Sequence, residues 1–254
     1  MKNYYINQIG IKETFMENLL YQIVSDIEEI KIRLSIPDGI VQIKNARFYL
    51  PNFPEDCIQR IMAMTQNYWD TVALDIINKY LPENAVILDI GANIGSHSVY
   101  WALEKNAKKI YAYEPLESTY KILKRNIKLN HLDKKIKAFK YGLYSTNSKA
   151  SVDNFHLANI GNTSFVPSVN GNFELKKLDS IRISEKIDLI KIDVEGAEVE
   201  VLIGAKNTIK KNKPVIVIES FNNKEEIDNI FTSYGYEQID TIRQGEDYIY
   251  KPID

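Results

Sequence analysis

One stretch about a third of the way along the chain constrains the fold most. Residues 85–96 read Ala-Val-Ile-Leu-Asp-Ile-Gly-Ala-Asn-Ile-Gly-Ser, an apolar run that leads into a glycine-containing turn. The pattern predicts a buried strand, a tight turn and the first turn of a helix. A second apolar run, 110–113, leads into Glu114-Pro115. A strand, a glycine turn and an acidic end of the next strand are typical of doubly wound α/β folds that hold the ribose of a nucleotide-like ligand.

The residues of this turn favour a ligand with cationic groups. Gly91 and Gly95 permit a tight turn and a close approach of the ligand to the backbone. A dinucleotide-binding turn would also have glycine at two positions where this chain has asparagine and serine. Asp89, just before the turn, would repel a pyrophosphate. We therefore expect S-adenosylmethionine, which carries an ammonium, a sulfonium and a ribose diol for Glu114, rather than a nicotinamide dinucleotide. A turn that serves only packing is the remaining alternative.

After residue 85 the chain alternates between apolar strands and amphipathic helices. We expect strands at 85–90, 109–114, 136–141, 187–193 and 214–219, and helices at 95–105, 117–130, 197–211 and 224–234. Such alternation predicts parallel strands covered on both faces by helices. The last two apolar runs, 236–240 and 248–251, have no helix between them and predict an antiparallel hairpin. The fold class expected is α/β and Rossmann-like, with a mostly parallel seven-stranded sheet that ends in this hairpin.

An N-terminal cap is expected at 1–80, ahead of a main domain at 81–254. The cap comprises a helix at 1–35, a β-hairpin at 40–50 and a helical region at 55–80. The main domain carries a polar insertion at 142–186, with weak strands near 149–155 and 172–178.

The first helix carries one apolar seam, in which the spacing alternates between four and three residues. Its members are Met16, Leu20, Ile23, Ile27, Ile30 and Leu34. Two interpretations stay open: the helix lies on its own domain, or the seam pairs two copies of the chain as a homodimer.

Carboxylates at the ends of the later strands are candidate catalytic groups. The fourth strand delivers Asp193 to its carboxyl end, with Glu195 just beyond, and the fifth strand ends in Glu219. The ligand crevice of such folds opens at these strand ends. Asp193 and Glu195 could orient or deprotonate a hydroxyl group or hold a divalent cation, or they could only cap the helix that follows. Glu219 is either a further substrate group or a solvated strand end.

Other candidates lie around the same crevice. His156 in the insertion and His97 after the glycine turn could act as bases near neutral pH. Gly142 and Leu143, after the third strand, are placed to approach an adenine. Cys57, which is the only cysteine, is expected to be a buried, inert thiol, and it excludes a thiolate zinc site and an internal disulfide.

The candidate site residues fall into two groups. Cofactor binding is assigned to Asp89, Gly91, Ala92, Asn93, Gly95, Glu114, Pro115, Gly142 and Leu143. Catalysis is assigned to Asp193, Glu195 and His156, and no metal ligand is assigned.

Charge and hydropathy limit the partners. The formal net charge of -2 argues against a nucleic-acid partner, because proteins that bind phosphate backbones usually carry an excess of basic residues. No apolar run approaches the ~20 residues of a membrane span, and the N-terminus does not resemble a secretory signal. A cytoplasmic location is therefore expected.

Several of these segments together resemble the FkbM-type methyltransferases. They are residues 86–95, 113–115, 159–164, 178–179, 190–198 and 214–219, and the resemblance covers about 85–220. Its most specific part is the string Ile-Asp-Val-Glu-Gly-Ala-Glu at 192–198. The resemblance implies a class I methyltransferase fold, with cofactor roles for Asp89, Gly91, Asn93 and Glu114.

The resemblance also implies a reaction, which is methyl transfer to a hydroxyl oxygen. The acceptor would be a small molecule, such as a sugar or nucleotide-activated sugar in surface polysaccharide (capsule) biosynthesis, or a polyketide. Asp193 and Glu195 would lie on the acceptor side. Two alternatives remain: transfer to a nitrogen or a phosphate-like oxygen of another small metabolite, and a non-catalytic interaction module that keeps the fold.

Overall fold

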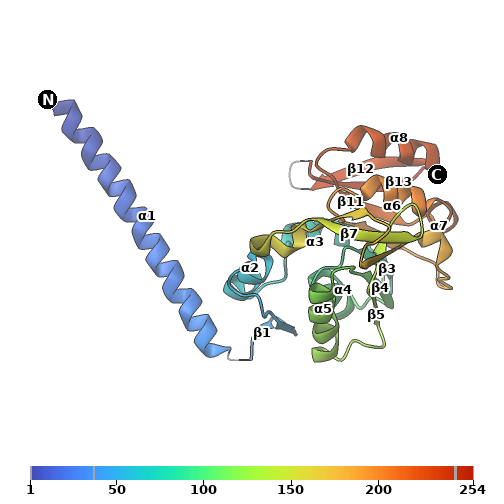
Figure 1. Cartoon of the computed structure of the whole chain (residues 1–254), viewed down its shortest axis with the longest axis horizontal. Helices are drawn as coiled ribbons and strands as arrows, with labels where there is room; N and C mark the ends of the chain where they lie inside the picture. Colours follow the sequence, from blue (N-terminus) through green and yellow to red (C-terminus); the bar gives the residue numbers. More distant parts are fainter. Residues whose placement is uncertain (1, 37, 243–244, 254) are drawn as a thin grey trace.

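A seven-stranded sheet forms the centre of the molecule (Figure 1). The computed structural model describes residues 2–36, 38–242 and 245–253, and side chains from residue 17 onward except residue 157 within those ranges. The strand order is β12-β13-β11-β10-β3-β4-β5. The strands are β3 (Val86–Ile90), β4 (Lys109–Tyr113), β5 (Ile136–Phe139), β10 (Leu189–Ile192), β11 (Val215–Glu219), β12 (Tyr236–Ile242) and β13 (Asp247–Pro252).

The directions of the strands confirm the predicted sheet. β3, β4, β5, β10 and β11 pair in parallel, whereas β13 pairs antiparallel with both β11 and β12. The terminal hairpin is therefore present, and every predicted strand of the main sheet exists. Parallel strands buried on both faces read as continuous apolar runs, which is why the pattern was informative here.

Helices cover both faces of the sheet. α3 (Thr71–Ile77), α4 (Ser96–Glu104) and α5 (Glu117–Leu129) pack on one face, and α6 (Glu198–Gly204), α7 (Lys206–Asn212) and α8 (Lys224–Tyr234) pack on the other. Neighbouring residues of one strand, such as Ile87 and Leu88, contribute to opposite layers of core. The prediction of a single helix at 197–211 is wrong in one respect, because the helix is interrupted at Ala205 between α6 and α7.

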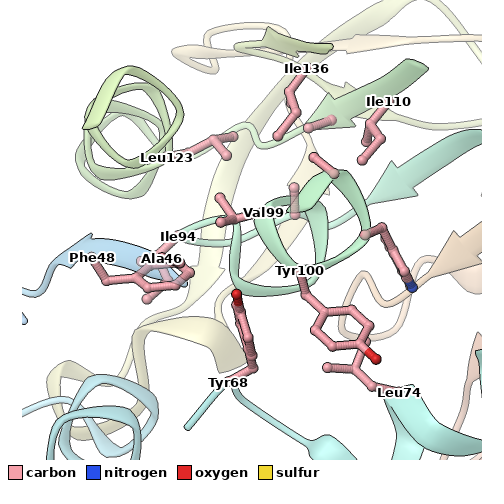
Figure 2. Close-up of a cluster of buried hydrophobic side chains, with 14 of the residues drawn as sticks. Ala46, Phe48, Tyr68, Leu74, Ile94, Val99, Tyr100, Ile110, Leu123 and Ile136 are labelled. Carbon is pink, nitrogen blue, oxygen red and sulfur yellow. The ribbon is translucent and has the colours of Figure 1, made fainter. Parts of the chain in front are cut away.

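The N-terminal elements are α1 (Lys2–Ser35), β1 (Ile40–Ile43), β2 (Ala46–Tyr49), α2 (Cys57–Thr65), α3 and a 3-10 turn, η1 (Asn78–Tyr80). Buried residues of β1, β2, α2 and α3 share the hydrophobic core of the sheet, and α1 adds the partly buried Ile32 to it. Figure 2 shows Tyr68 between Phe48 of β2 and Tyr100 of α4, and the Tyr68 ring lies 5.0 Å from the Tyr100 ring and 5.9 Å from the Phe48 ring. The domain boundary at residue 80 stays a prediction.

Two features of this region differ from a simple helical pattern. The helical region predicted at 55–80 is split, because Gln66 and Asp70 take left-handed backbone conformations with φ near +49°. Asp70 then caps α3 by accepting a hydrogen bond from the Ala73 amide at 3.0 Å. α1 extends away from the sheet, so that its N-terminal end lies far from the rest of the chain (Figure 1).

The insertion forms a second, four-stranded sheet with the order β6-β9-β7-β8. Its elements are β6 (Gly142–Leu143), β7 (Ser148–Asn154), η2 (Leu157–Asn162), β8 (Ser164–Pro167), β9 (Phe173–Lys176) and η3 (Leu178–Ser180). The two predicted weak strands correspond to β7 and β9, whereas β6 and β8 were not predicted. Among the helices of the described residues, none is long and apolar enough to cross a membrane.

Candidate active site

A cavity of about 630 Å³ opens at the carboxyl ends of β3, β4, β10 and β11. Its walls come from segments far apart in the sequence: α2 and α3, the insertion around η2, and residues 221–223 after β11. Parallel strands bring their carboxyl ends to one edge, so a cavity at this edge can be lined from several loops at once.

Glu114 holds two backbone amides at the end of β4. One carboxylate oxygen accepts from the Asn93 amide at 3.0 Å and the other from the Leu116 amide at 2.8 Å. Burial raises the pKa of Glu114 to about 7, and the two hydrogen bonds offset this effect only in part. Each oxygen can accept a second hydrogen bond, so the pair suits a ligand with two adjacent hydroxyl groups.

Gly91 brings the turn after β3 against the end of β10. Ile90 pairs with Ile192 in the sheet, so the residues that follow them are neighbours. Gly91 has a φ of +79°, and a Cβ atom there would lie 1.7 Å from the backbone oxygen of Asp193. Only glycine fits this contact, which joins the glycine turn directly to the loop that carries the candidate catalytic acid.

Lys191 lies beneath this contact as a buried cation. Its ammonium is 2.9 Å from the Asp193 carboxylate, 3.6 Å from that of Asp89, and 3.2 Å from the Gly91 carbonyl oxygen. Burial disfavours the ammonium, but the Asp193 and Asp89 carboxylates hold the pKa of Lys191 above its usual value. The lysine therefore links the strand before the glycine turn to Asp193.

Asp193 is also hydrogen-bonded to Glu219, the last residue of β11. Register explains their proximity, because Ile192 pairs with Ile218 and the two acids come next on adjacent strands. Burial opposes ionisation, but Lys191 and the hydrogen bond with Glu219 hold the pKa of Asp193 below its usual value. A carboxyl group whose pKa lies below its usual value is ionised at neutral pH, so Asp193 carries a negative charge.

The loop after Asp193 is not an ordinary helix cap. α6 begins after Ala197, and this N-cap residue makes no side-chain capping hydrogen bond. Glu195 has a left-handed backbone with a φ of +53°, which costs free energy for a residue other than glycine and is common at functional sites. The N-cap position is thus held by neither Asp193 nor Glu195, and both line the cavity.

Most of the residues assigned to the site from sequence meet at the cavity. Those that line it are Gly91, Asn93, Glu114, Pro115, Gly142, Leu143, Asp193 and Glu195. His97 also lines it, at the start of α4.

Four assigned residues do not line the cavity. Asp89 is fully buried; it accepts a hydrogen bond from Ser98 at 2.6 Å and pairs across the strands with Lys191. A direct contact of its carboxylate with a ligand is therefore not supported. Ala92 and Gly95 shape the turn, and Gly95 leads into α4 with a φ of +86°. His156 is exposed and lies outside the lining, so the catalytic role expected for it is not proposed further.

Several residues of the site were missed or misjudged in the sequence. Lys191 was missed, although a lysine inside an apolar strand was a usable signal. Cys57, the first residue of α2, was expected to be buried, but it is exposed and lines the cavity. Asp56 was also missed: one carboxylate oxygen caps α2 at Gln59, and the other accepts from the Ile160 amide of η2 at 3.0 Å. This residue holds the insertion over the cavity.

Comparison with known proteins identifies methyltransferases among the relatives of the chain. A family model described as the methyltransferase FkbM domain matches residues 89–240. Methyltransferase sdnD of Sordaria araneosa is 34% identical over 167 residues, which are 51% of this chain and 63% of that protein. Hexuronic acid methyltransferase AglP of Haloferax volcanii is 24% identical over 203 residues, covering 77% of this chain and 82% of that protein.

A solved structure is similar as well. Methyltransferase FkbM from Methylobacillus flagellatus KT is 14% identical, with a TM-score of 0.46 over 76% of this chain and 52% of that chain. The chain thus spans about 63% of the first curated relative and about half of this solved chain. The family match runs from β3 to β12 and takes in Glu114, Asp193 and Glu219. The chain therefore belongs to the FkbM methyltransferase family.

Proposed function

We propose that the protein is an O-methyltransferase that uses S-adenosylmethionine and acts on a hydroxyl group of a small, uncharged, sugar-type acceptor. One observation supports the proposal: the carboxylate of Glu114, which suits a diol, and the ionised carboxylate of Asp193 line the same cavity, with Gly91 in contact with Asp193 between them. Surface polysaccharide biosynthesis is the proposed setting, and the cytoplasm is the compartment that supplies the donor.

The cofactor side of the cavity fits S-adenosylmethionine. Glu114 would accept the ribose hydroxyls, and Gly142 and Leu143 would lie beside the adenine. The buried phenol oxygen of Tyr113, at the cavity wall, has no hydrogen-bond partner within the described part of the chain and can bind a polar group of the ligand. When bound, S-adenosylmethionine supplies a methyl group on a positively charged sulfur, with a neutral sulfide as the leaving group.

Asp193 is the residue to which we assign the acceptor hydroxyl. An ionised carboxylate can accept a hydrogen bond from the hydroxyl, orient its oxygen and take its proton. Lys191 keeps Asp193 charged, and Glu219 fixes one side of its carboxylate. Because the donor is already activated, positioning of the acceptor oxygen is the main contribution left to the protein.

The charges around the cavity favour an uncharged acceptor. Besides Glu114 and Asp193, the lining holds the carboxyl groups of Asp70, Glu195, Glu198, Glu219 and Asp247. Lys191 is the one lysine or arginine among the described lining residues, and it is already paired with two carboxylates. A phosphate or diphosphate would be repelled here, which disfavours a nucleotide-activated sugar. The relative that acts on a hexuronic acid supports the sugar class, although its acceptor is anionic.

A panel of acceptors tests this proposal. The purified protein and S-adenosylmethionine are incubated with methyl glycosides of neutral hexoses and deoxyhexoses, with the matching hexuronates and with uridine-diphosphate hexoses. We expect S-adenosylhomocysteine and a methyl ether to form from a neutral glycoside, as detected by mass spectrometry. Methylation confined to the uronates or the nucleotide sugars would contradict the neutral acceptor. Absence of S-adenosylmethionine binding in calorimetry would contradict the proposed activity itself.

Binding of S-adenosylmethionine should release protons through Glu114. In the free protein the pKa of Glu114 is about 7. The carboxylate form accepts the ribose hydroxyls, so binding lowers this pKa, and about half a proton should leave per site at pH 7. The affinity for S-adenosylmethionine should therefore weaken as the pH falls below 7, because protonated Glu114 must first ionise. Calorimetry at one pH in buffers of different ionisation enthalpy measures the release.

Two variants isolate this effect. Glu114→Gln should abolish the proton release and weaken the affinity about 10- to 100-fold, the usual range for a lost charge-assisted hydrogen bond. Glu117→Gln is the matched control, because Glu117 is a half-exposed acid on α5 outside the cavity lining. An equal proton release by wild type and Glu114→Gln would contradict the assigned role of Glu114.

A further inference from the structure

The seam of α1 is an apolar surface that its own domain leaves uncovered. In the described side chains it comprises Leu20, Ile23, Ile27, Ile30 and Leu34, while the side chain of Met16 lies outside the described ones. Together with the flanking Leu19 and Val24, these residues have exposed fractions between 43% and 78%. A continuous apolar stripe of this kind on a projecting helix marks an interaction surface.

The contacts between α1 and α2 show which way the seam faces. Arg60 of α2 donates a hydrogen bond to Ser25 at 3.1 Å and forms an ion pair with Glu29 at 2.5 Å. Ile32 of α1 is partly buried against the core. If the seam occupies heptad positions a and d, Ser25 and Ile32 occupy f and Glu29 occupies c. Positions c and f lie on the outer side of a coiled coil, and Arg33, which pairs with Glu55 at 2.7 Å, occupies position g beside the seam. The domain therefore leaves positions a and d open.

The residues beside the seam match a second copy of the same helix. In a parallel two-stranded coiled coil, position g of one helix faces position e of the next heptad in the other helix. Leu19 at g would then face Val24 of the second copy, and Asp26 at g would face Lys31. One pair is apolar and the other carries opposite charges. The antiparallel alignment that pairs Leu20 with Ile30 and Ile27 with Ile23 would instead bring Asp26 close to Asp26 of the second copy.

We infer that the protein forms a homodimer in which the α1 helices of two copies pair as a parallel, in-register coiled coil. The two catalytic domains then lie on the outer sides of the coiled coil, because each contacts positions c, f and g of its own helix. The interface involves no residue of the cavity, so the inference is independent of the proposed reaction.

Sedimentation velocity of the full chain tests the dimer. We expect wild type to sediment at twice the 29.3 kDa mass of one chain at micromolar concentration. Ile27→Asp should convert it to a monomer, since it places two carboxylates at the centre of the seam. Tyr21→Asp is the matched control: it adds the same charge to α1 at an exposed position b, off the seam, and should stay dimeric. A monomeric wild type, or a dimer unaffected by Ile27→Asp, would overturn the inference.

The orientation of the helices has its own test. In a Cys57→Ser background, Ile27→Cys places one thiol at position a of each helix, where parallel in-register partners lie within the about 6 Å Cα separation that a disulfide needs. We expect rapid disulfide formation on mild oxidation, and none for Tyr21→Cys in the same background. A dimer that fails to cross-link through Ile27→Cys would overturn the parallel arrangement. Binding of monomeric wild type to anionic lipid vesicles through α1 would overturn the dimer in favour of a membrane surface.

Discussion

Replacing Asp193 with asparagine should lower kcat by a factor of about 10² to 10⁴ while S-adenosylmethionine still binds, because this is the usual range for loss of a group that takes up a proton. Asparagine has nearly the same shape, so the backbone contact between residue 193 and Gly91 is retained. The amide cannot take the acceptor proton, and the hydrogen bonds with Lys191 and Glu219 must rearrange. Formation of S-adenosylhomocysteine measures kcat, with the neutral glycoside from the panel as acceptor, and calorimetry measures cofactor binding.

His156→Ala is the control for this experiment. Both residues were candidates for catalysis in the sequence, but His156 is exposed and lies outside the cavity lining. Its replacement should leave kcat and cofactor affinity unchanged. A near-normal kcat for Asp193→Asn would show that Asp193 has only a structural role. A large loss in His156→Ala would mean that the acceptor binds outside the cavity described above.

The difference between these two residues shows how far the sequence could lead. Asp193 and Glu114 each follow an apolar run, and a residue at the end of a parallel strand lies at the ligand edge whatever the order of the strands. His156 lies in the insertion, and periodicity does not reveal where such a segment folds. The four-stranded sheet of the insertion directs its 3-10 segment, η2, toward the cavity but leaves His156 exposed.

Asp89 illustrates a second limit of sequence-based prediction, because the pattern of residues does not reveal which strands pair. Considered alone, β3 presents a carboxylate just before the glycine turn, and a cationic ligand is a reasonable partner for it. In the sheet, Asp89 pairs with Lys191 of β10, about a hundred residues later in the chain, and the lysine takes the place expected for the ligand. The same pairing brings Asp193 beside Gly91, and the pairing of β10 with β11 brings it beside Glu219. Sequence periodicity shows that strands exist, but it does not give their register.

Replacing Gly91 with alanine should lower the affinity for S-adenosylmethionine at least about 100-fold. Of all the substitutions named, it should also lower the free energy of unfolding most. Alanine at a φ of +79° costs about 1–2 kcal/mol in backbone strain alone. Its Cβ atom would also lie 1.7 Å from the Asp193 carbonyl oxygen. That oxygen belongs to the backbone and cannot rotate away, so the glycine turn and the loop after β10 must separate.

Gly235→Ala separates the backbone strain from the steric clash with the Asp193 carbonyl oxygen. Gly235 has a φ of +78°, close to that of Gly91, but a Cβ atom there meets nothing within 4 Å. Unfolding in urea should show only the strain cost for Gly235→Ala, with normal calorimetric binding of S-adenosylmethionine. The additional loss of stability in Gly91→Ala then measures the contact between the glycine turn and Asp193. Equal stability of the two variants, with normal cofactor affinity in Gly91→Ala, would show that the two halves of the cavity are not joined through this contact.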